Sequence, residues 1–227
     1  MTTFADLGVP VPLFLGEHRH AEGVTDGHRC VLCARAGVCL PLDDVVVACG
    51  SCGGQTRIRT KGRAANRRDT CHRCDAPVTL HAALTPPAAE SLTLGVPLAL
   101  RGCVSCLRAG RWAQTHVTEA GAIRWEDDAG AELTRTPRYA TFQGERWLCC
   151  HDLPMCYLGE WTRRDFDAAR PGAGDALFDE IVRDIDPASA ADAWEHGLTP
   201  HGGEPDLRVY VFRCQRCTTL RAHSDCG

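Results

Sequence analysis

The segments CVLC (residues 30–33), CGSC (49–52), CHRC (71–74) and CVSC (103–106) decide the fold of this chain. Two thiolates separated by two residues can bind one metal ion from a tight turn, and two such turns complete a tetrahedral site. Zn²⁺ suits these ligands because it accepts thiolates without redox chemistry. The gap between the inner two segments is within the range of structural zinc sites. The four segments therefore predict two closed zinc sites.

These four cysteine pairs can be joined in two ways. In chain order, the first pair joins the second and the third joins the fourth. In the nested arrangement, the inner pairs join each other and the outer pairs close a site around them. The stretch from Val45 to Leu80 favours nesting, because it is typical of two short hairpins with a Cys-x-x-Cys at each turn, joined by the polar run KGRAANRR (61–68).

A fifth Cys-x-x-Cys, Cys214 and Cys217, ends the alternating stretch DLRVYVF (206–212). The cluster that can complete its site lies in residues 149–156, with Cys149 and His151 as alternative ligands. A redox pair is the rival interpretation, but such a pair usually begins a helix, and no helical pattern follows Cys217. We expect three zinc ions per chain. The twelve predicted ligands are Cys30, Cys33, Cys103, Cys106, Cys49, Cys52, Cys71, Cys74, Cys150, Cys156, Cys214 and Cys217.

Two resemblances add to this interpretation. The segments TRTPRYATFQGERWLCCHDLPMCYLGEWTRRDF (134–166) and VYVFRCQRCTTLRAHSDCG (209–227) resemble the core and closing signatures of the CbrC family of bacterial proteins, and RCVLCARAG (29–37) and GCVSCLRAGRWA (102–113) resemble its earlier turns. Residues 45–80, closing with CHRCDAPVTL (71–80), resemble the N-terminal zinc ribbon of one class of bacterial thioredoxins. The ribbon looks inserted into the first ribbon of the family, which implies nesting. The founding member of the family is associated with tolerance to a DNase colicin.

The charge of the chain is low overall but uneven. The formal net charge is −4, which indicates neither nucleic acid nor membrane as a general partner. Residues 56–74 carry seven basic side chains against Asp69, and residues 165–195 carry nine acidic side chains against two arginines. The basic segment is a candidate nucleic-acid contact. Its candidate residues are Arg57, Arg59, Lys61, Arg63, Arg67 and Arg68.

We expect a cytoplasmic protein. The N-terminal stretch lacks a basic region, and Pro10 and Pro12 interrupt its apolar run, so it does not resemble a signal peptide. No stretch of 18 apolar residues is present, so no membrane-spanning helix is expected. Reducing conditions would keep the cysteines available as metal ligands.

The predicted fold is a small, irregular α+β protein stabilised by zinc, with ribbons, a sheet of short strands and two or three helices. Residues 1–44 and 81–120 would form an outer zinc-ribbon region, 45–80 an inserted ribbon, and 121–227 a core with the third zinc site. We expect short strands at 121–125, 146–149 and 208–213. An apolar stripe at helical spacing predicts a helix over 174–186, and Asp186 followed by Pro187 predicts the start of a second over 187–196.

No catalytic set is visible in the sequence, and four-thiolate zinc sites are structural. We therefore expect a non-catalytic protein-interaction module that takes part in toxin tolerance or immunity against a nuclease toxin, with another protein as partner. The alternatives are a nucleic-acid-binding zinc-ribbon protein and a thiol-redox or zinc-handling factor.

Overall fold

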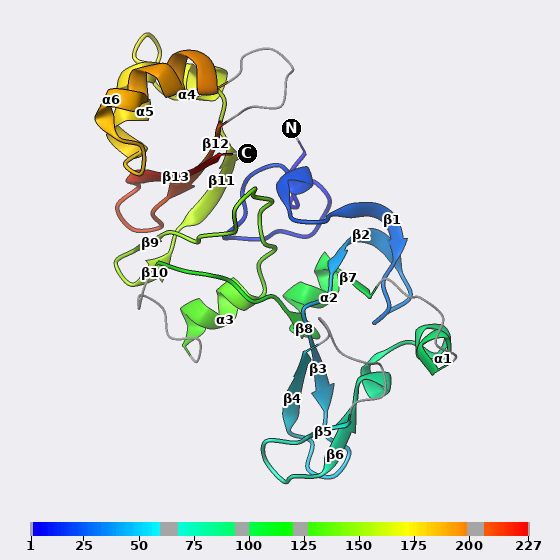
Figure 1. The fold of residues 1–227 in the computed structure, drawn as a ribbon. Helices are drawn as coiled ribbons and strands as arrows, with labels where there is room; N and C mark the ends of the chain where they lie inside the picture. Colours follow the sequence, from blue (N-terminus) through cyan, green and yellow to red (C-terminus); the bar gives the residue numbers. More distant parts are fainter. Residues whose placement is uncertain (1, 60–67, 94–99, 120–126, 199–206, 227) are drawn as a thin grey trace. The chain divides into compact units, whose positions relative to one another are not determined.

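The computed structural model describes residues 2–59, 68–93, 100–119, 127–198 and 207–226 (Figure 1). The chain divides into two compact units. The first, which we call the hairpin unit, contains residues 21–115 and 133–138, and the C-terminal unit contains residues 1–20, 116–132 and 139–227. The described strands pair in small antiparallel sheets, accompanied by short helices, so the predicted α+β class is confirmed. None of the described helices is long and apolar enough to cross a membrane.

An outer sheet organises the hairpin unit. Its three antiparallel strands have the order β1-β2-β7: β1 (Thr25–Arg29), β2 (Ala36–Pro41) and β7 (Arg101–Cys103). The short helix α2 (Val104–Arg108) follows β7 directly. Because Cys39 on β2 faces Cys103 on β7, the sheet brings residues near 30 and near 105 to the same place.

The inner part of this unit contains the two hairpins expected from residues 45–80. One is formed by β3 (Asp44–Ala48) and β4 (Gln55–Arg59), the other by β5 (Arg68–Thr70) and β6 (Pro77–Thr79). Strand β3 also pairs with β8 (Trp112–Ala113), so the base of the first hairpin is part of a three-stranded sheet.

The connection after the inner hairpins contains a helix that its hydrophobic pattern does not indicate. Residues 81–102 show no sustained helical stripe, yet the structure has the 3₁₀ turn η2 (Leu80–Ala83) and the helix α1 (Pro86–Thr93) there. Proline is favoured in the first turn of a helix, because its fixed φ suits a helix start and its missing N–H needs no partner there. The pair Pro86–Pro87 was therefore a helix-start signal.

A glycine on the edge strand β7 of the outer sheet leads to a first mutational prediction. A Cβ on Gly102 would lie 2.6 Å from Cδ2 of Leu42 and 2.7 Å from Nε1 of Trp112, both buried side chains. Gly102→Ala is therefore expected to lower the free energy of unfolding by about 1–3 kcal/mol through overpacking. Urea denaturation measures this loss. Gly37→Ala on β2 is the matched control, since nothing lies within 4 Å of its added Cβ, and an equal loss in both variants would contradict the packing explanation.

The C-terminal unit is built on a second antiparallel sheet, β11-β12-β13. Its strands are β11 (Cys156–Glu160), β12 (Leu207–Arg213) and β13 (Leu220–Cys226), so the strand expected at 208–213 is confirmed. Val209 and Val211 pack in one buried apolar cluster with Phe166, Leu177 and Phe178. The helices of this layer are α4 (Arg163–Ala169), α5 (Gly174–Ile181) and α6 (Pro187–Asp192), which continues as the π-helical turn η3 (Ala193–Gly197).

The helix predictions were correct in place but not in extent. The first helix ends at Ile181 instead of residue 186, because Val182 leaves the helix and forms a bridge with Ala222 of β13. Asp186 does cap the next helix, since its Oδ1 accepts the N–H of Ser189 at 3.2 Å. Helix α4 was not predicted, although Thr162 and Asp165 form a capping box at its start.

An aromatic cluster packs on the face of the sheet opposite to Val209 and Val211, since Tyr210 and Phe212 alternate with them on β12. Its fully buried members are Tyr139, Trp147, Tyr157, Tyr210 and Phe212. The rings of Tyr139 and Tyr157 stack at 4.8 Å, and the ring of Phe212 lies 5.4–5.6 Å from those of Tyr139, Trp147 and Tyr157.

The N-terminal arm joins this cluster. The ring of Phe14 lies 4.8 Å from that of Tyr157, and the arm exchanges backbone hydrogen bonds with Tyr157 through Leu13 and Leu15. The arm includes the 3₁₀ turn η1 (His18–His20). Residues 1–20 thus belong to the C-terminal unit, although we expected residues 1–44 in the outer ribbon region.

The remaining expected strands also shift. The strand expected at 146–149 appears as β9 (Cys149–Cys150), which pairs with β10 (Leu153–Pro154). The strand expected at 121–125 lies outside the described residues. The residues that follow, DDAG (127–130), lead into the helix α3 (Asp128–Thr134), with the Asp127 side chain accepting the N–H of Gly130 at 2.8 Å.

Candidate metal centres

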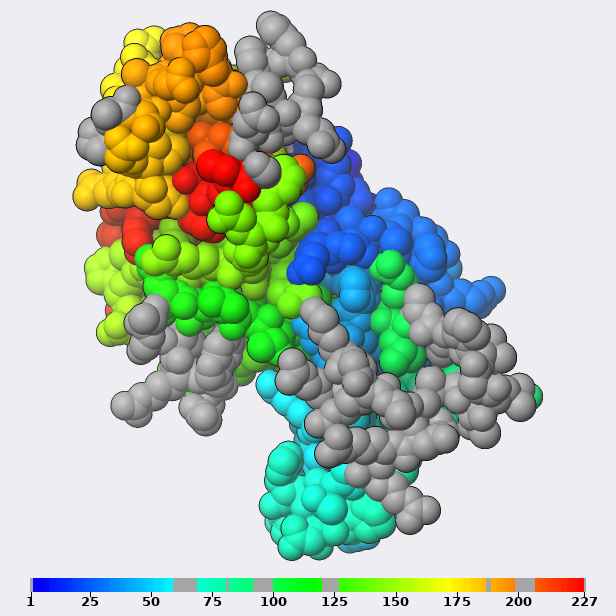
Figure 2. Space-filling model, viewed as in Figure 1, coloured from blue at the N-terminus to red at the C-terminus, as the bar shows by residue number. Residues whose placement is uncertain are grey.

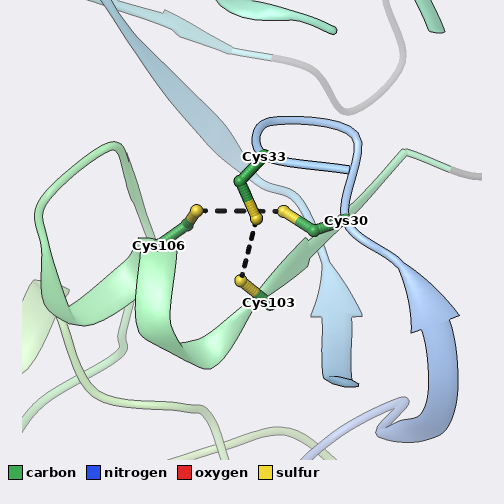
Figure 3. A group of neighbouring side chains, drawn as sticks. All are labelled: Cys30, Cys33, Cys103 and Cys106. Atoms are coloured by element: carbon green, nitrogen blue, oxygen red, sulfur yellow. Dashed lines mark hydrogen bonds between the residues drawn. The ribbon is translucent and has the colours of Figure 1, made fainter. Parts of the chain in front are cut away.

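Four cysteines converge between the outer sheet and helix α2, forming what we call the outer centre (Figure 3). Cys30 and Cys33 come from the turn between β1 and β2, and Cys103 and Cys106 come from the end of β7 and from α2. The Sγ atoms of Cys30 and Cys106 lie 3.9 Å apart, and those of Cys33 and Cys103 lie 3.7 Å apart. The outer pairs therefore lie together, as nested pairing predicts.

The inner centre repeats this arrangement between the two hairpins. The Sγ atoms of Cys49 and Cys74 lie 3.6 Å apart, as do those of Cys52 and Cys71. A tetrahedral zinc ion with Zn–S bonds of about 2.3 Å separates its sulfur ligands by roughly 3.8 Å. The sulfur–sulfur distances in both centres are close to that edge length, so both sets of ligands fit zinc.

The same backbone turn presents the thiols in four of the five Cys-x-x-Cys segments. The first cysteine donates its N–H to the carbonyl five residues later, at 2.8–2.9 Å. The residue after the second cysteine takes a left-handed conformation with φ of 57–70°: Ala34, Gly53, Asp75 and Thr218. The exception is Cys103–Cys106, where the first turn of α2 brings the thiols together.

Backbone N–H groups in these turns also stabilise thiolates, the form that binds metal. The N–H of Arg73 lies 3.4 Å from Sγ of Cys71 and lowers the pKa of that thiol to about 6. Burial raises the pKa of Cys214, but the N–H groups of Cys217 and Arg216 outweigh burial and lower it to about 6. Cys39 has the opposite setting, because burial raises its pKa to about 12. Cys39 is fully buried and lies outside the three candidate metal groups.

The third centre joins the β9–β10 hairpin to the turn after β12. Its ligand atoms come from Cys150, His151, Cys214 and Cys217. The Sγ atoms of Cys150 and Cys217 lie 3.8 Å apart, and Nδ1 of His151 lies 3.6 Å from Sγ of Cys214. Three thiolates and one imidazole are a common structural zinc set, so this centre also fits zinc.

The prediction that Cys156 completes the third centre was wrong, and His151, given as an alternative, takes its place. Cys156 begins strand β11 opposite Arg213, so sheet register fixes its position. The two-residue turn of the hairpin places both His151 and Asp152 at positive φ, 55° and 57°, as in a type I′ turn. Histidine and aspartate are enriched in that conformation, so the pair could have indicated the turn.

Cys149, the other alternative, is not in the third centre. It precedes Cys150 on a strand, and successive side chains of a strand point to opposite faces. The Cys149 thiol is buried, and burial raises its pKa to about 11. The neutral thiol is therefore the favoured form, which suits packing and not metal binding.

The sequence of the chain matches the model of a known protein family. The model of the uncharacterised protein family UPF0167 matches residues 42–226, most of the chain. The chain belongs to this family. The matched residues contain the whole inner and third centres, whereas Cys30 and Cys33 of the outer centre precede them. Comparisons with curated proteins and with solved structures give no match.

A charged clamp supports the third centre of this UPF0167 protein. The guanidinium of Arg221 donates to both carboxylate oxygens of Glu119, at 2.7 and 2.9 Å, and to the carbonyl of Cys149 at 2.8 Å. Glu119 also accepts the N–H of Cys149 at 3.1 Å. The clamp connects β9, which carries the ligand Cys150, to β13. No local sequence pattern indicates this clamp.

The basic cluster predicted in the inner ribbon is only partly described in this UPF0167 structure. Arg57 lies on β4 with an exposed side chain. The side chains of Arg59 and Arg68 are outside the described part, and Lys61, Arg63 and Arg67 lie outside the described residues. The nucleic-acid alternative therefore remains a prediction.

Proposed function

We propose that this UPF0167 protein is a zinc-stabilised, non-catalytic module that binds another protein. The observation that supports this is common to the three centres. Each brings four ligand atoms within 4.8 Å of one another, which is a full tetrahedral set for zinc. Catalytic zinc usually has three protein ligands and keeps its fourth position for water or substrate. Zinc in these centres would hold segments of the chain together, not activate a water molecule.

The purified protein is expected to contain three zinc ions per chain, because the three groups supply twelve ligands. Elemental analysis of the native protein, with a count of alkylatable thiols before and after chelation, measures this. A zinc content of one or none in a natively folded protein would refute the proposal.

Thiol-redox activity is supported less well. Cys103 and Cys106 do lie at the start of a helix, which is the usual setting of a redox pair. Helix α2 has only five residues, however, and both sulfurs lie within 4.8 Å of two further thiols. This setting favours metal binding.

The acidic helical layer is the proposed partner surface. Figure 2 shows the segments of α4, α5 and α6, coloured yellow to orange, gathered on one face of the C-terminal unit. Much of their acidic charge has a structural role: Glu180 pairs with Arg170, Glu195 with Arg163, and Asp184 with His223. Asp175 and Asp179 on α5 are exposed and form no ion pair within the described part of the chain, so they are suited to attract a basic partner.

The resemblance to the CbrC family supports a nuclease toxin as that partner. A nuclease must bind the phosphate backbone of DNA, so its binding face is rich in lysine and arginine. The double variant Asp175→Lys and Asp179→Lys is therefore expected to slow association with a DNase colicin domain and to weaken the salt dependence of association. Stopped-flow measurements at two salt concentrations test this.

A matched double variant places the same charge change elsewhere. Glu90 on α1 and Asp128 on α3 are exposed, and Glu90→Lys with Asp128→Lys should leave association close to wild type. Equal effects in both double variants would indicate only a general charge effect. The absence of any association with the wild-type protein would exclude this class of partner.

A further inference from the structure

The three centres differ in how far their ligands are exposed. In the outer centre, Cys33 is half-buried and the other three cysteines are buried. In the inner centre one ligand, Cys74, is exposed. In the third centre two are exposed, Cys217 from the turn after β12 and His151 from the β9–β10 hairpin, so both halves of the third centre face solvent.

The third centre also has the weakest set of sulfur ligands. It replaces one thiolate by an imidazole, and soft thiolates are the ligands that favour zinc binding most. The reactivity of a cysteine with an oxidant depends on its exposure as well as on its thiolate character. The inner centre also exposes one sulfur, that of Cys74, but it has four thiolate ligands, so we expect a small oxidant to react first at the third centre.

A partner sulfur lies within reach of the exposed one. The Sγ atoms of Cys217 and Cys150 are 3.8 Å apart, and they come from segments that are distant in sequence. A disulfide has an S–S bond of about 2 Å, so the two sulfur atoms need to approach each other by only about 2 Å. The remaining cysteine ligand, Cys214, is 3% exposed, and its Sγ accepts hydrogen bonds from the N–H groups of Arg216 and Cys217.

We propose that the third centre is an oxidation site, at which a peroxide converts Cys217 and Cys150 into a reversible disulfide. The peroxide O–O bond breaks, the sulfur of Cys217 becomes a sulfenic acid, and one water leaves. The sulfur of Cys150 then attacks the sulfur of Cys217, and the displaced hydroxide takes a proton from the Cys150 thiol, or from solvent where Cys150 is a metal-bound thiolate, and leaves as a second water. Two sulfurs are oxidised by two electrons in total, and the peroxide is reduced to two waters.

Oxidation removes two of the four ligands of the third centre, and His151 with Cys214 do not complete a tetrahedral site. The inference rests on the proposed zinc binding only for this consequence, the release of metal. Oxidation would therefore change how the β9–β10 hairpin is held, because the third centre joins this hairpin to the end of β12. The disulfide keeps the same two segments connected, so oxidation would exchange one link for another.

The test treats the full-length protein, with its zinc, with hydrogen peroxide in the presence of a chromogenic zinc chelator. We expect one zinc ion per chain to be released about tenfold faster than the others, in step with the loss of the Cys217 thiol. Alkylation and peptide mapping by mass spectrometry should then find Cys150 linked to Cys217. Dithiothreitol with added zinc should restore the original zinc content and thiol count.

Two variants sharpen the test. Cys226, an exposed cysteine outside the three centres, is the matched control, and Cys226→Ser should leave both release and linkage unchanged. Cys150→Ser removes the partner sulfur, so Cys217 should accumulate as a sulfenic acid that a cyclic diketone labels. This labelling does not require bound zinc.

Several results would overturn the inference. One is a disulfide between Cys49 and Cys74 that forms before any disulfide at Cys217. The others are a disulfide between Cys214 and Cys217, and the absence of any disulfide at Cys217 after peroxide treatment. Failure of the proposed function looks different, since it would appear as low zinc content before any peroxide is added. The disulfide map of the wild-type protein decides between the sulfur pairs in either case.

Discussion

Replacing Cys214 by serine is expected to unfold the C-terminal unit while the outer and inner centres keep their metal. Cys214 is the most buried ligand of the third centre, and its sulfur accepts two backbone N–H groups. The third centre joins residues 149–154 to residues 214–217, which the chain separates by the three helices α4 to α6. Zinc binding contributes about 10–16 kcal/mol to the folding of small zinc peptides. This equals or exceeds the total stability of a typical domain, about 5–15 kcal/mol.

Zinc content and tryptophan fluorescence during thermal unfolding measure this effect. Trp147 is fully buried in the C-terminal unit, so its emission reports the loss of that core. Cys156→Ala is the control, because Cys156 is buried near the third centre but is not one of its ligands. That variant should keep three zinc ions. A Cys214→Ser protein that melts at the wild-type temperature with all its zinc would show that the third centre is not a metal site.

The two N-terminal centres were largely predictable from the sequence. Cys-x-x-Cys requires only a local turn. In that turn the residue after Cys33, Cys52 and Cys74 takes the same left-handed backbone conformation. The choice between nested and sequential pairing depended on the hairpins within residues 45–80, and those hairpins are present. What the sequence could not show is the pairing of β3 with β8, because that contact joins residues far apart in the chain.

The third centre was only partly predictable, because its second half is not a Cys-x-x-Cys segment. Cys150 and His151 are adjacent and point to one metal site only because the hairpin turn places His151 at positive φ. Cysteine spacing favoured Cys156, but the register of β11 against β12 takes that residue out of the ligand set. Spacing predicts a site only where the backbone between the ligands forms a single local turn.

The core of the C-terminal unit was the least predictable part. Its aromatic cluster draws Phe14 from the N-terminal arm, Tyr139 from a loop, and Tyr210 from β12. The arm is held by a few backbone hydrogen bonds to Tyr157 and by ring contacts, not by a helix or strand of its own. Its sequence therefore shows no periodic pattern. Such contacts follow from the tertiary fold, so no local window of sequence contains them.

The last prediction concerns the outer centre, where nested pairing has its largest consequence. Cys103 is the final residue of β7 and faces Cys39 across the outer sheet. Its sulfur lies 3.7 Å from that of Cys33, in the turn that connects β1 to β2. Cys103→Ser therefore removes the link between the two ends of the sheet and leaves three other thiols, two of them buried, without a complete metal site. We expect the loss of one zinc ion and the unfolding of β1, β2 and β7, an effect of the same order as that of Cys214→Ser.

Thiol footprinting shows which partners the lost ligand had. After Cys103→Ser, iodoacetamide should label Cys30, Cys33 and Cys106, while the inner centre stays protected because its four ligands all lie between residues 49 and 74. The matched variant Cys71→Ser should give the reverse pattern, exposing Cys49, Cys52 and Cys74 alone. Sequential pairing requires a different result, in which Cys103→Ser makes Cys71 and Cys74 reactive and leaves Cys30 and Cys33 protected. Because the two arrangements expose different cysteines, one labelling experiment distinguishes them even if both variants lose the same amount of zinc.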